Sequence, residues 1–161
     1  MNKQETKLLL VPSARGIVIE NNKILLVREK EGRWHIPGGW IDSNGEPMKK
    51  CVERELYEET GLKVKAIKLL FIYEQIVPDK MEVYDGLHRI EHHFLCNVEY
   101  GKLNDSWIDH DNNLIQHRKF FSIDEIKNMK DSQTSPYDLL SNLNLEKIVT
   151  MDCSYFGKFF D

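Results

Sequence analysis

The stretch GGWIDSNGEPMKKCVERELYEETGL, residues 38–62, decides the fold, because its second half is patterned as a helix. Pro47 suits the first helical position, and Gly61 suits the left-handed residue that commonly ends a helix. The stretch therefore predicts a helix over residues 47–60. Three carboxylates crowd its last turns: Glu55, Glu58 and Glu59. Their place on the helix decides whether they serve a function or only face solvent.

A helical wheel separates these carboxylates from the other polar side chains. Successive helical residues are about 100° apart, so one side collects the apolar residues Met48, Cys51, Val52 and Leu62, with Leu56 at its edge. Glu55 and Glu59 lie in the middle of this apolar side, and Glu58 lies at its border. The polar side holds Lys49, Lys50, Glu53, Tyr57 and Thr60. Only Glu53 lies where a solvated glutamate belongs, so the other three are expected to point toward the body of the protein.

Carboxylates in that position are unfavourable unless a proton or a cation compensates them. Two of them about 5 Å apart repel by roughly 3 kcal/mol at an effective dielectric constant of 20. Positions i, i+3 and i+4 of a helix converge, and oxygen ligands without His or Cys favour Mg²⁺ or Mn²⁺ over zinc. Two other interpretations stay open at this point: a solvated face, or a buried salt bridge to Arg54 or another arginine.

Length and composition predict one soluble domain over residues 1–161. The net charge of −4 gives no sign of binding to a nucleic-acid polymer and argues weakly against an anionic membrane surface. No apolar run is long enough to span a membrane. The three cysteines lack the spacing of a metal site or a disulfide framework, which favours reduced thiols: Cys51, Cys96 and Cys153. We therefore expect a cytoplasmic protein.

The chain around the helix reads mainly as strands. Apolar and β-branched runs predict them at residues 14–20, 23–28, 34–37, 63–73, 91–100 and 117–121. Asn21-Asn22 predicts a tight hairpin turn, and Pro37-Gly38-Gly39 is expected to end the third strand. Ser122 opens a capping box, and Ser135-Pro136 is expected to cap and open a last helix. Polar segments 74–90 and 101–116 read as loops. Several strands per helix without βαβ alternation indicate a mixed α+β fold.

Residues 39–62 resemble the Nudix box, which reads G, five residues, E, seven residues, R-E, an aliphatic, one residue, E-E, one residue, G and an aliphatic. From Glu46 onward every fixed position matches: Arg54, Glu55, Leu56, Glu58, Glu59, Gly61 and Leu62. One departure exists, because six residues rather than five separate Gly39 from Glu46. We assign the extra residue, Ser43 or Asn44, to the turn before the helix. The departure puts the geometry of Gly39 in doubt and does not touch the helix.

The resemblance implies a fold, a reaction and a role for each residue. The implied fold is an α/β/α sandwich with a mixed sheet and a loop–helix–loop motif. The implied reaction is the hydrolysis of a pyrophosphate linkage in a nucleoside diphosphate derivative with Mg²⁺ or Mn²⁺. The implied metal ligands are Glu55, Glu59, Glu58 and the carbonyl of Gly39. Glu58 is alternatively the general base, Arg54 orients the carboxylates, and Glu46 pairs with Arg54.

Specificity lies outside the box, where the sequence says less. Pro78 lies sixteen residues after Leu62, a distance that resembles family members acting on ADP-ribose. Aromatic rings able to stack on a base or nicotinamide are Trp34, Trp40, Tyr84 and Trp107. Asp109 and Asp111 could add a carboxylate from a later loop. His92 and His93 are expected on opposite faces of a strand, which excludes a shared ion.

Three classes of function remain after this reading. The favoured one is a Nudix pyrophosphohydrolase acting on a small nucleotide, with an ADP-ribose or nucleotide-sugar type slightly favoured over a nucleoside triphosphate pyrophosphatase. The second is a nucleotide sensor on the same fold, although no acid of the box is missing. The third, an isopentenyl-diphosphate isomerase-like enzyme, depends on Cys and Glu positions that cannot be matched here. A homodimer is compatible with the sequence.

Overall fold

The computed structural model describes residues 7–77, 86–104, 106–108, 114–130, 133–150 and 152–158. Within this described part, nine strands form one sheet. They are β1 (Leu8–Glu20), β2 (Lys23–Glu29), β3 (Trp34–His35), β4 (Gly38–Trp40), β5 (Lys63–Val77), β6 (Gly86–Tyr100), β7 (Ile115–Phe121), β8 (Thr134–Ser135) and β9 (Ser154–Lys158). Parallel and antiparallel pairs both occur, which confirms the predicted mixed sheet.

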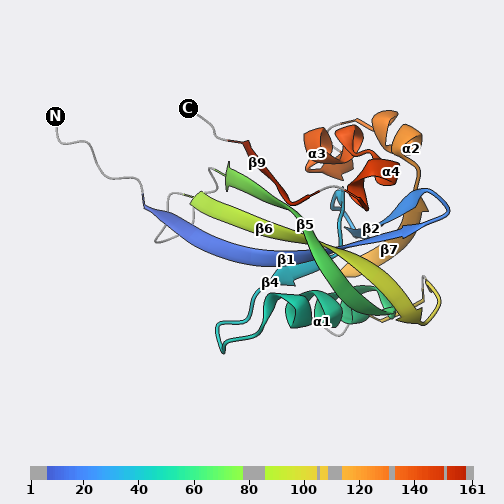
Figure 1. The fold of residues 1–161 in the computed structure, drawn as a ribbon, viewed down its shortest axis with the longest axis horizontal. Helices are drawn as coiled ribbons and strands as arrows, with labels where there is room; N and C mark the ends of the chain where they lie inside the picture. The colour runs from blue at the N-terminus through green and yellow to red at the C-terminus, as the bar shows by residue number, and fades with distance from the viewer. Residues whose placement is uncertain are drawn as a thin grey trace.

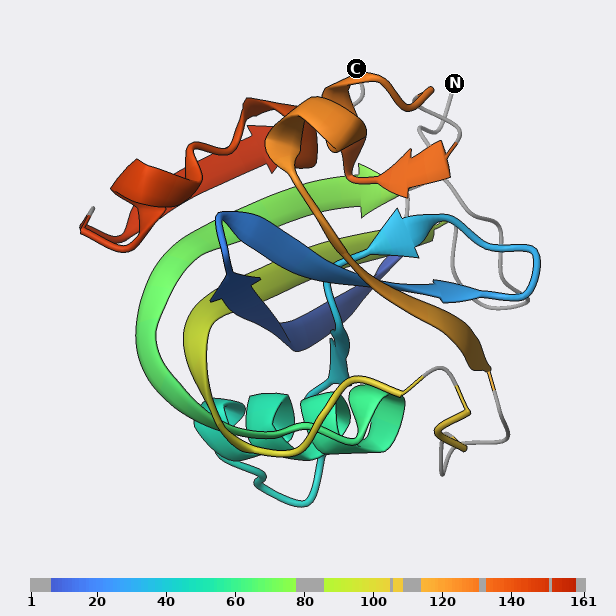
Figure 2. The same cartoon turned by 90° about the vertical axis from the view of Figure 1, so that its right-hand side faces the viewer.

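Strand β1 is the centre of this sheet. Its hairpin with β2 turns at Asn21 and Asn22, whose φ angles of 49° and 57° confirm the predicted left-handed turn. β6 runs parallel to β1 from the pair Leu8–Gly86 onward, and β4 runs antiparallel to β1. β5 and β6 form a long antiparallel pair that curls around one side of the molecule (Figure 2). β1 is thereby flanked by segments from distant parts of the chain.

Helices cover both faces of the sheet (Figure 1). α1 (Met48–Thr60) packs on one face, and α2 (Ile123–Lys127), α3 (Tyr137–Asn142) and α4 (Leu145–Ile148) lie on the other. Alternation along β2 fills two cores, because Leu25 is buried under α1 while Ile24 and Leu26 are buried on the side of α2–α4. The α/β/α sandwich implied by the resemblance is therefore confirmed.

Several element boundaries differ from those predicted. β4 forms where Pro37-Gly38-Gly39 was expected only to end a strand, because β1 supplies backbone partners for Gly38 and Gly39. The segment 74–90 was predicted as a loop, but β5 continues to Val77 and β6 begins at Gly86, since each strand pairs with the other. Long-range pairing overrides the polar composition here. β8, α4 and β9 were not predicted.

The helix ends follow the expected residues, with two corrections. Gly61 has a φ of 73° and ends α1 as predicted, and Ser122 forms the predicted capping box with Glu125. Pro47 is the N-cap of α1 rather than its first helical residue. The expected serine cap of α3 is wrong, because Ser135 is paired in β8 and Pro136 holds the capping position.

No helix in the described part of the chain is long and apolar enough to cross a membrane.

Candidate functional site

Two of the three carboxylates of α1, those of Glu59 and Glu55, lie beside the backbone of β4. The amide of Gly38 donates a 2.9 Å hydrogen bond to Oε2 of Glu59. A Cβ on Gly39 would lie 2.7 Å from the carboxylate of Glu55, so only a glycine leaves room for that side chain. The side chain of Glu55 is 14% exposed and that of Glu58 is 24% exposed. A fully solvated face is thereby excluded.

Arg54 binds the acids on its side of the helix. Its Nε and one terminal nitrogen donate to both oxygens of Glu46, at 2.8 and 2.9 Å. The other terminal nitrogen donates to Glu55 and to Glu58, each at 2.8 Å. The hydrogen bonds from Arg54 lower the pKa of Glu46 below its usual value. The salt bridge to Arg54 that the sequence left open is therefore present, although Glu59 is held by Gly38 instead.

Three N–H groups donate hydrogen bonds to backbone carbonyls at the C-terminal end of α1. The amide of Gly61 donates to the carbonyl of Tyr57, and Nε1 of Trp107 donates to that of Glu58, both at 2.9 Å. Nε of Arg118, on β7, donates to the carbonyl of Glu59. The last carbonyls of a helix have no partner within it. Trp107 and Arg118 therefore hold the turn that carries two of the acids.

Trp107 gives the first testable prediction. Trp107→Phe is expected to lower the free energy of unfolding by about 1 kcal/mol, because it removes one hydrogen bond and keeps most of the ring contact with Tyr57. Urea unfolding followed by circular dichroism measures this change. Trp40→Phe is the control, since that ring is 60% exposed, and an equal loss in both variants would contradict the role of Trp107.

Three wheel assignments on α1 are wrong. Glu53 was expected to be solvated, but it accepts hydrogen bonds from the amide of Ala66 and from Lys50, and it pairs with Lys65. It therefore ties α1 to β5. Thr60 was placed on the polar side, yet it is fully buried with its hydroxyl bonded to the helix backbone. Met48, assigned to the apolar side, is 40% exposed at the helix start.

The extra residue of the box is absorbed in an exposed turn. Asp42 accepts hydrogen bonds from the backbone and the side chain of Asn44, and Gly45 follows with a φ of 93°. Gly39 lies before this turn, paired with Ala14 in β4. The extra residue therefore does not move Gly39 away from Glu55.

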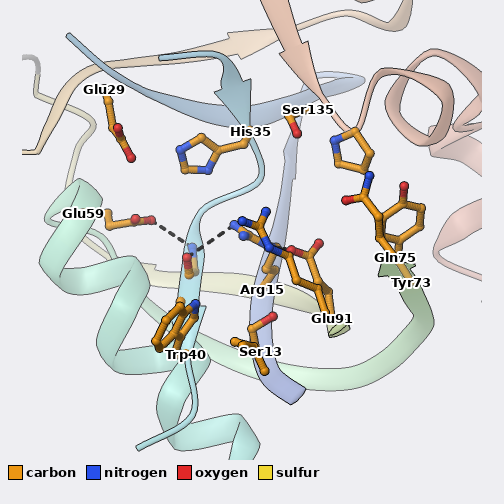
Figure 3. A pocket seen from close by; sticks show the side chains of 15 residues that line it. Ser13, Arg15, Glu29, His35, Trp40, Glu59, Tyr73, Gln75, Glu91 and Ser135 are labelled. Carbon is orange, nitrogen blue, oxygen red and sulfur yellow. Dashed lines mark hydrogen bonds and ion pairs between the residues drawn. The ribbon is translucent and has the colours of Figure 1, made fainter. Parts of the chain in front are cut away.

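Two neighbouring hollows meet at β4. The first, called here the acidic pocket, encloses about 520 Å³ and is bordered by Glu55, Glu58, Glu59, Leu114 and Ile115. The second, called here the polar pocket, encloses about 300 Å³ and is lined by Ser13, Arg15, His35, Tyr73, Gln75, Arg89, Glu91 and Ser135. Figure 3 shows the polar pocket. Both hollows share Glu29, Gly38, Gly39, Trp40 and Glu59, so one molecule could extend through both.

The sequence reasoning missed most of the polar pocket. Arg15 and Glu91 form an ion pair, with Nε of Arg15 3.0 Å from Oε1 of Glu91. Nε2 of His93 lies 3.3 Å from the other oxygen of Glu91, and its ring stacks on Phe71 at 4.5 Å. Burial favours the neutral form of Glu91, but Arg15 and His93 outweigh it and hold the pKa of that carboxyl well below its usual range. A buried charged group thus borders the pocket.

The other residues considered from the sequence fall in different places. Trp40 lines both hollows, whereas Trp34 lines neither and packs edge-on against Phe121 at 4.7 Å. His93 is fully buried, and His92 lies on the opposite side of the strand, as expected. The ring of His92 contacts the carbonyl of Ser13. Residues outside the described part of the chain are Pro78, Tyr84, Asp109 and Asp111.

The donor set fits a hard divalent cation. Glu55, Glu58 and Glu59 offer only oxygen ligands, and Gly39 leaves the space beside Glu55 that a side chain would fill. Among the described residues, no group of three Asp, Glu, His or Cys side chains converges on one point. The carboxylates are instead held apart, because Glu55 and Glu58 accept hydrogen bonds from Arg54 while Glu59 accepts one from the amide of Gly38.

His35, at the edge of the polar pocket, makes stability depend on pH. Burial, and then the charge of Arg15, lower its pKa from 6.5 to about 4, although the hydrogen bond with the carbonyl of Ile36 and the charge of Glu91 oppose this shift. Because the unfolded chain binds this proton first, stability is present above pH 6.5 and falls as the pH drops toward 4. We expect a loss of about 2 kcal/mol between pH 7.5 and pH 5.

Urea unfolding of the wild type and of His35→Gln at the two pH values measures this loss. The variant should lose less stability on acidification, although not none, because burial also lowers the pKa of His93. Equal losses in the two proteins would contradict the assignment to His35.

Comparisons with known proteins identify the family of this chain. The NUDIX domain model matches residues 10–143. An ADP-ribose pyrophosphatase of Methanocaldococcus jannaschii is 41% identical over 69 residues, which cover 40% of this chain and 39% of that protein. The chain thus aligns with only about two fifths of that relative's length.

Solved structures show the same fold at lower identity. An ADP-ribose pyrophosphatase from Streptococcus suis has a TM-score of 0.58 at 23% identity, covering 90% of this chain and 98% of that one. A UDP-X diphosphatase has a TM-score of 0.66 at 22% identity, covering 94% and 69%. Because the NUDIX domain match extends over more than half of the sequence and the fold agrees, the chain belongs to the Nudix family.

Proposed function

We propose that this protein is a metal-dependent pyrophosphohydrolase that cleaves the diphosphate linkage of a nucleoside diphosphate derivative. The observation that carries the proposal is the junction of the acidic pocket and the polar pocket at Gly38, Gly39 and Glu59. A diphosphate at this junction would lie beside the carboxylates of α1. The group attached to it would extend into the polar pocket.

The acids of α1 hold the cation in this proposal, and Arg54 and Glu46 orient them. Glu55, Glu58 and Glu59 would hold Mg²⁺ or Mn²⁺, which neutralises phosphate charge and lowers the pKa of water when it is bound. Arg54 keeps Glu55 and Glu58 turned to one side of the helix, and Glu46 fixes Arg54 through two hydrogen bonds. Glu58 is alternatively the base that takes a proton from the attacking water.

The charges of the polar pocket favour a neutral group over a further phosphate. Arg15 is engaged by Glu91 and by backbone carbonyls, which leaves Arg89 as the other arginine or lysine among the described residues of a lining that also carries Glu29 and Glu59. A further phosphate would meet a negative balance here. Hydroxyl groups of a sugar could instead bond to Ser13, Tyr73, Gln75 and Ser135. The exposed ring of Trp40 could stack on a base.

These features support a substrate of the ADP-ribose or nucleotide-sugar type. The relative from Methanocaldococcus jannaschii that is 41% identical over 69 residues bears the name ADP-ribose pyrophosphatase, which agrees with this choice. A cytoplasmic location and a homodimer stay predictions.

A hydrolysis screen with Mg²⁺ and with Mn²⁺ tests the proposal. The panel contains ADP-ribose, NADH, nucleotide sugars, dinucleoside polyphosphates and all nucleoside triphosphates, and product masses in isotopically labelled water identify the phosphorus attacked. We expect kcat/KM for ADP-ribose or a nucleotide sugar to exceed that for any triphosphate by at least about tenfold. A chelator should abolish turnover, and added Mg²⁺ should restore it.

Two outcomes would contradict parts of the proposal. A preference for a triphosphate would favour a nucleoside triphosphate pyrophosphatase and overturn the charge argument. Binding of a nucleotide without any hydrolysis would favour a sensor.

A further inference from the structure

We propose that Arg15 is a positioning residue, which together with Glu91 holds the backbone of residues 36–38 where it sets the carboxylates of α1 for cation binding. This inference rests on the proposed function, since it concerns the same acids. It assigns a task to a buried ion pair that the reaction itself does not use.

The guanidinium of Arg15 donates hydrogen bonds to the backbone of residues 36–38, the segment that leads into β4. One terminal nitrogen donates to the carbonyl of Ile36 at 2.8 Å and to the carbonyl of Gly38 at 3.4 Å. The backbone of Arg15 pairs with Gly38 between β1 and β4, and the amide of Gly16 donates to the carbonyl of Pro37 at 2.9 Å. The side chain and the backbone of β1 therefore hold the same short segment.

That segment, with the next residue Gly39, lies beside two acids of α1. The amide of Gly38 donates to Glu59, and Gly39 leaves open the space beside the carboxylate of Glu55, since a Cβ there would lie 2.7 Å from it. Figure 3 shows Arg15 and Glu59 on opposite sides of the chain at β4, each joined to it by a dashed line. A shift of Gly38 would move Glu59 through its hydrogen bond and change the space left for Glu55.

Glu91 explains why an arginine can stay in this place. The side chain of Arg15 is 18% exposed and that of Glu91 is 7% exposed, so each charge needs the other. Glu91 lies on β6, which pairs with β1 in parallel and brings Glu91 opposite Ser13. His93 borders the second oxygen of Glu91, and Phe71 packs on the ring of His93. The ion pair is thus anchored in the core while its donors reach the segment at β4.

The planar fork of an arginine suits this double task. It can face a carboxylate with one N–H and a backbone carbonyl with another at fixed angles, whereas a lysine offers a single point charge. A buried ion pair is often replaced by apolar residues without loss of stability. The pair Arg15–Glu91 can therefore be removed as a unit, which separates positioning from stability.

The test uses Arg15→Met/Glu91→Met, Arg15→Lys and the matched control Arg89→Met. Arg89 lies on β6 and lines the same pocket, but among the described residues it makes no hydrogen bond or ion pair with β4, so its loss should raise KM and leave cation binding unchanged. Folding is checked by circular dichroism and thermal unfolding. Binding of Mn²⁺ is measured by electron paramagnetic resonance without any nucleotide, and kcat and KM are measured with the best substrate of the screen.

We expect the double variant to fold, to bind Mn²⁺ about 10- to 100-fold more weakly, and to lose kcat with little change in KM. Arg15→Lys should recover part of the Mn²⁺ affinity, and it carries the test if the double variant does not fold. Mn²⁺ affinity equal to that of the wild type in folded variants would overturn the inference. Normal Mn²⁺ affinity with a raised KM would also overturn it, because Arg15 would then contact the substrate directly.

The wild type separates this inference from the proposed function. Wild-type protein that binds Mn²⁺ but hydrolyses nothing in the panel would overturn the proposed function alone, while weaker Mn²⁺ binding by the variants would still support the role of Arg15.

Discussion

Glu59→Gln is expected to lower kcat by about 10³-fold or more while the protein stays folded, a change that corresponds to several kcal/mol of transition-state stabilisation. Glutamine keeps an oxygen that can accept the hydrogen bond from the amide of Gly38, so β4 should stay in place. It removes the negative charge that a divalent cation needs. Steady-state kinetics with Mg²⁺ and thermal unfolding of the same sample measure the two effects separately.

Glu53→Gln is the matched control on the same helix. Glu53 borders neither hollow at β4 and instead ties α1 to Ala66 on β5. Its replacement should lower the free energy of unfolding by about 1 kcal/mol or less, because the ion pairs with Lys50 and Lys65 are partly exposed. kcat should not change. Near-wild-type kcat in Glu59→Gln would remove Glu59 from the proposed ligands.

The acids of α1 could be found from the sequence because they are a local pattern. Helical periodicity relates Glu55, Glu58 and Glu59 within two turns, and no distant contact is needed to bring them together. The same periodicity misjudged Glu53, because a wheel shows the direction of a side chain and not the strand that lies beyond it. Lys65 and the amide of Ala66 come from β5, which a wheel does not contain.

The polar pocket could not be predicted in this way, because it is assembled by distant pairings. Arg15 and Glu91 meet only through the parallel register of β1 and β6, which no periodic pattern in either strand reveals. A weak signal was present. Arg15 shares its strand face with the buried Ile17, and Glu91 shares its face with the buried His93. A charged residue on a core-facing position of a strand needs a partner, although the sequence does not name it.

Neighbouring glycines of β4 are expected to fail in different ways when each is replaced by alanine. Gly38 has a φ of 136°, and a Cβ there would lie 2.3 Å from the carbonyl oxygen of Ala14 and 2.6 Å from Cα of Arg15. Neither backbone atom can move without breaking the pairing of β1 and β4. Gly38→Ala should therefore lower the free energy of unfolding by about 3–5 kcal/mol through strain and overpacking.

Gly39→Ala should instead leave a folded protein that has lost activity. Its Cβ would lie 2.7 Å from the carboxylate of Glu55, which is the end of a flexible side chain and can swing away. Displacing Glu55 by about 1 Å is expected to lower kcat by about 10²-fold and to weaken Mn²⁺ binding, while thermal unfolding changes little.

Gly45→Ala separates backbone strain from crowding in this series. Gly45 has a φ of 93° with nothing within 4 Å of the Cβ position, so its replacement should cost about 1 kcal/mol in stability and nothing in kcat. Thermal unfolding and kcat measured for all three variants decide between the two effects. Full activity in Gly39→Ala would mean that the space beside Glu55 is not part of the site. A loss of stability in Gly38→Ala no greater than that in Gly45→Ala would mean that the close contact with β1 does not require a glycine at position 38. The contact of Gly38 with β1 makes this glycine a requirement of the fold. The space that Gly39 leaves for Glu55 makes the second glycine a requirement of the chemistry.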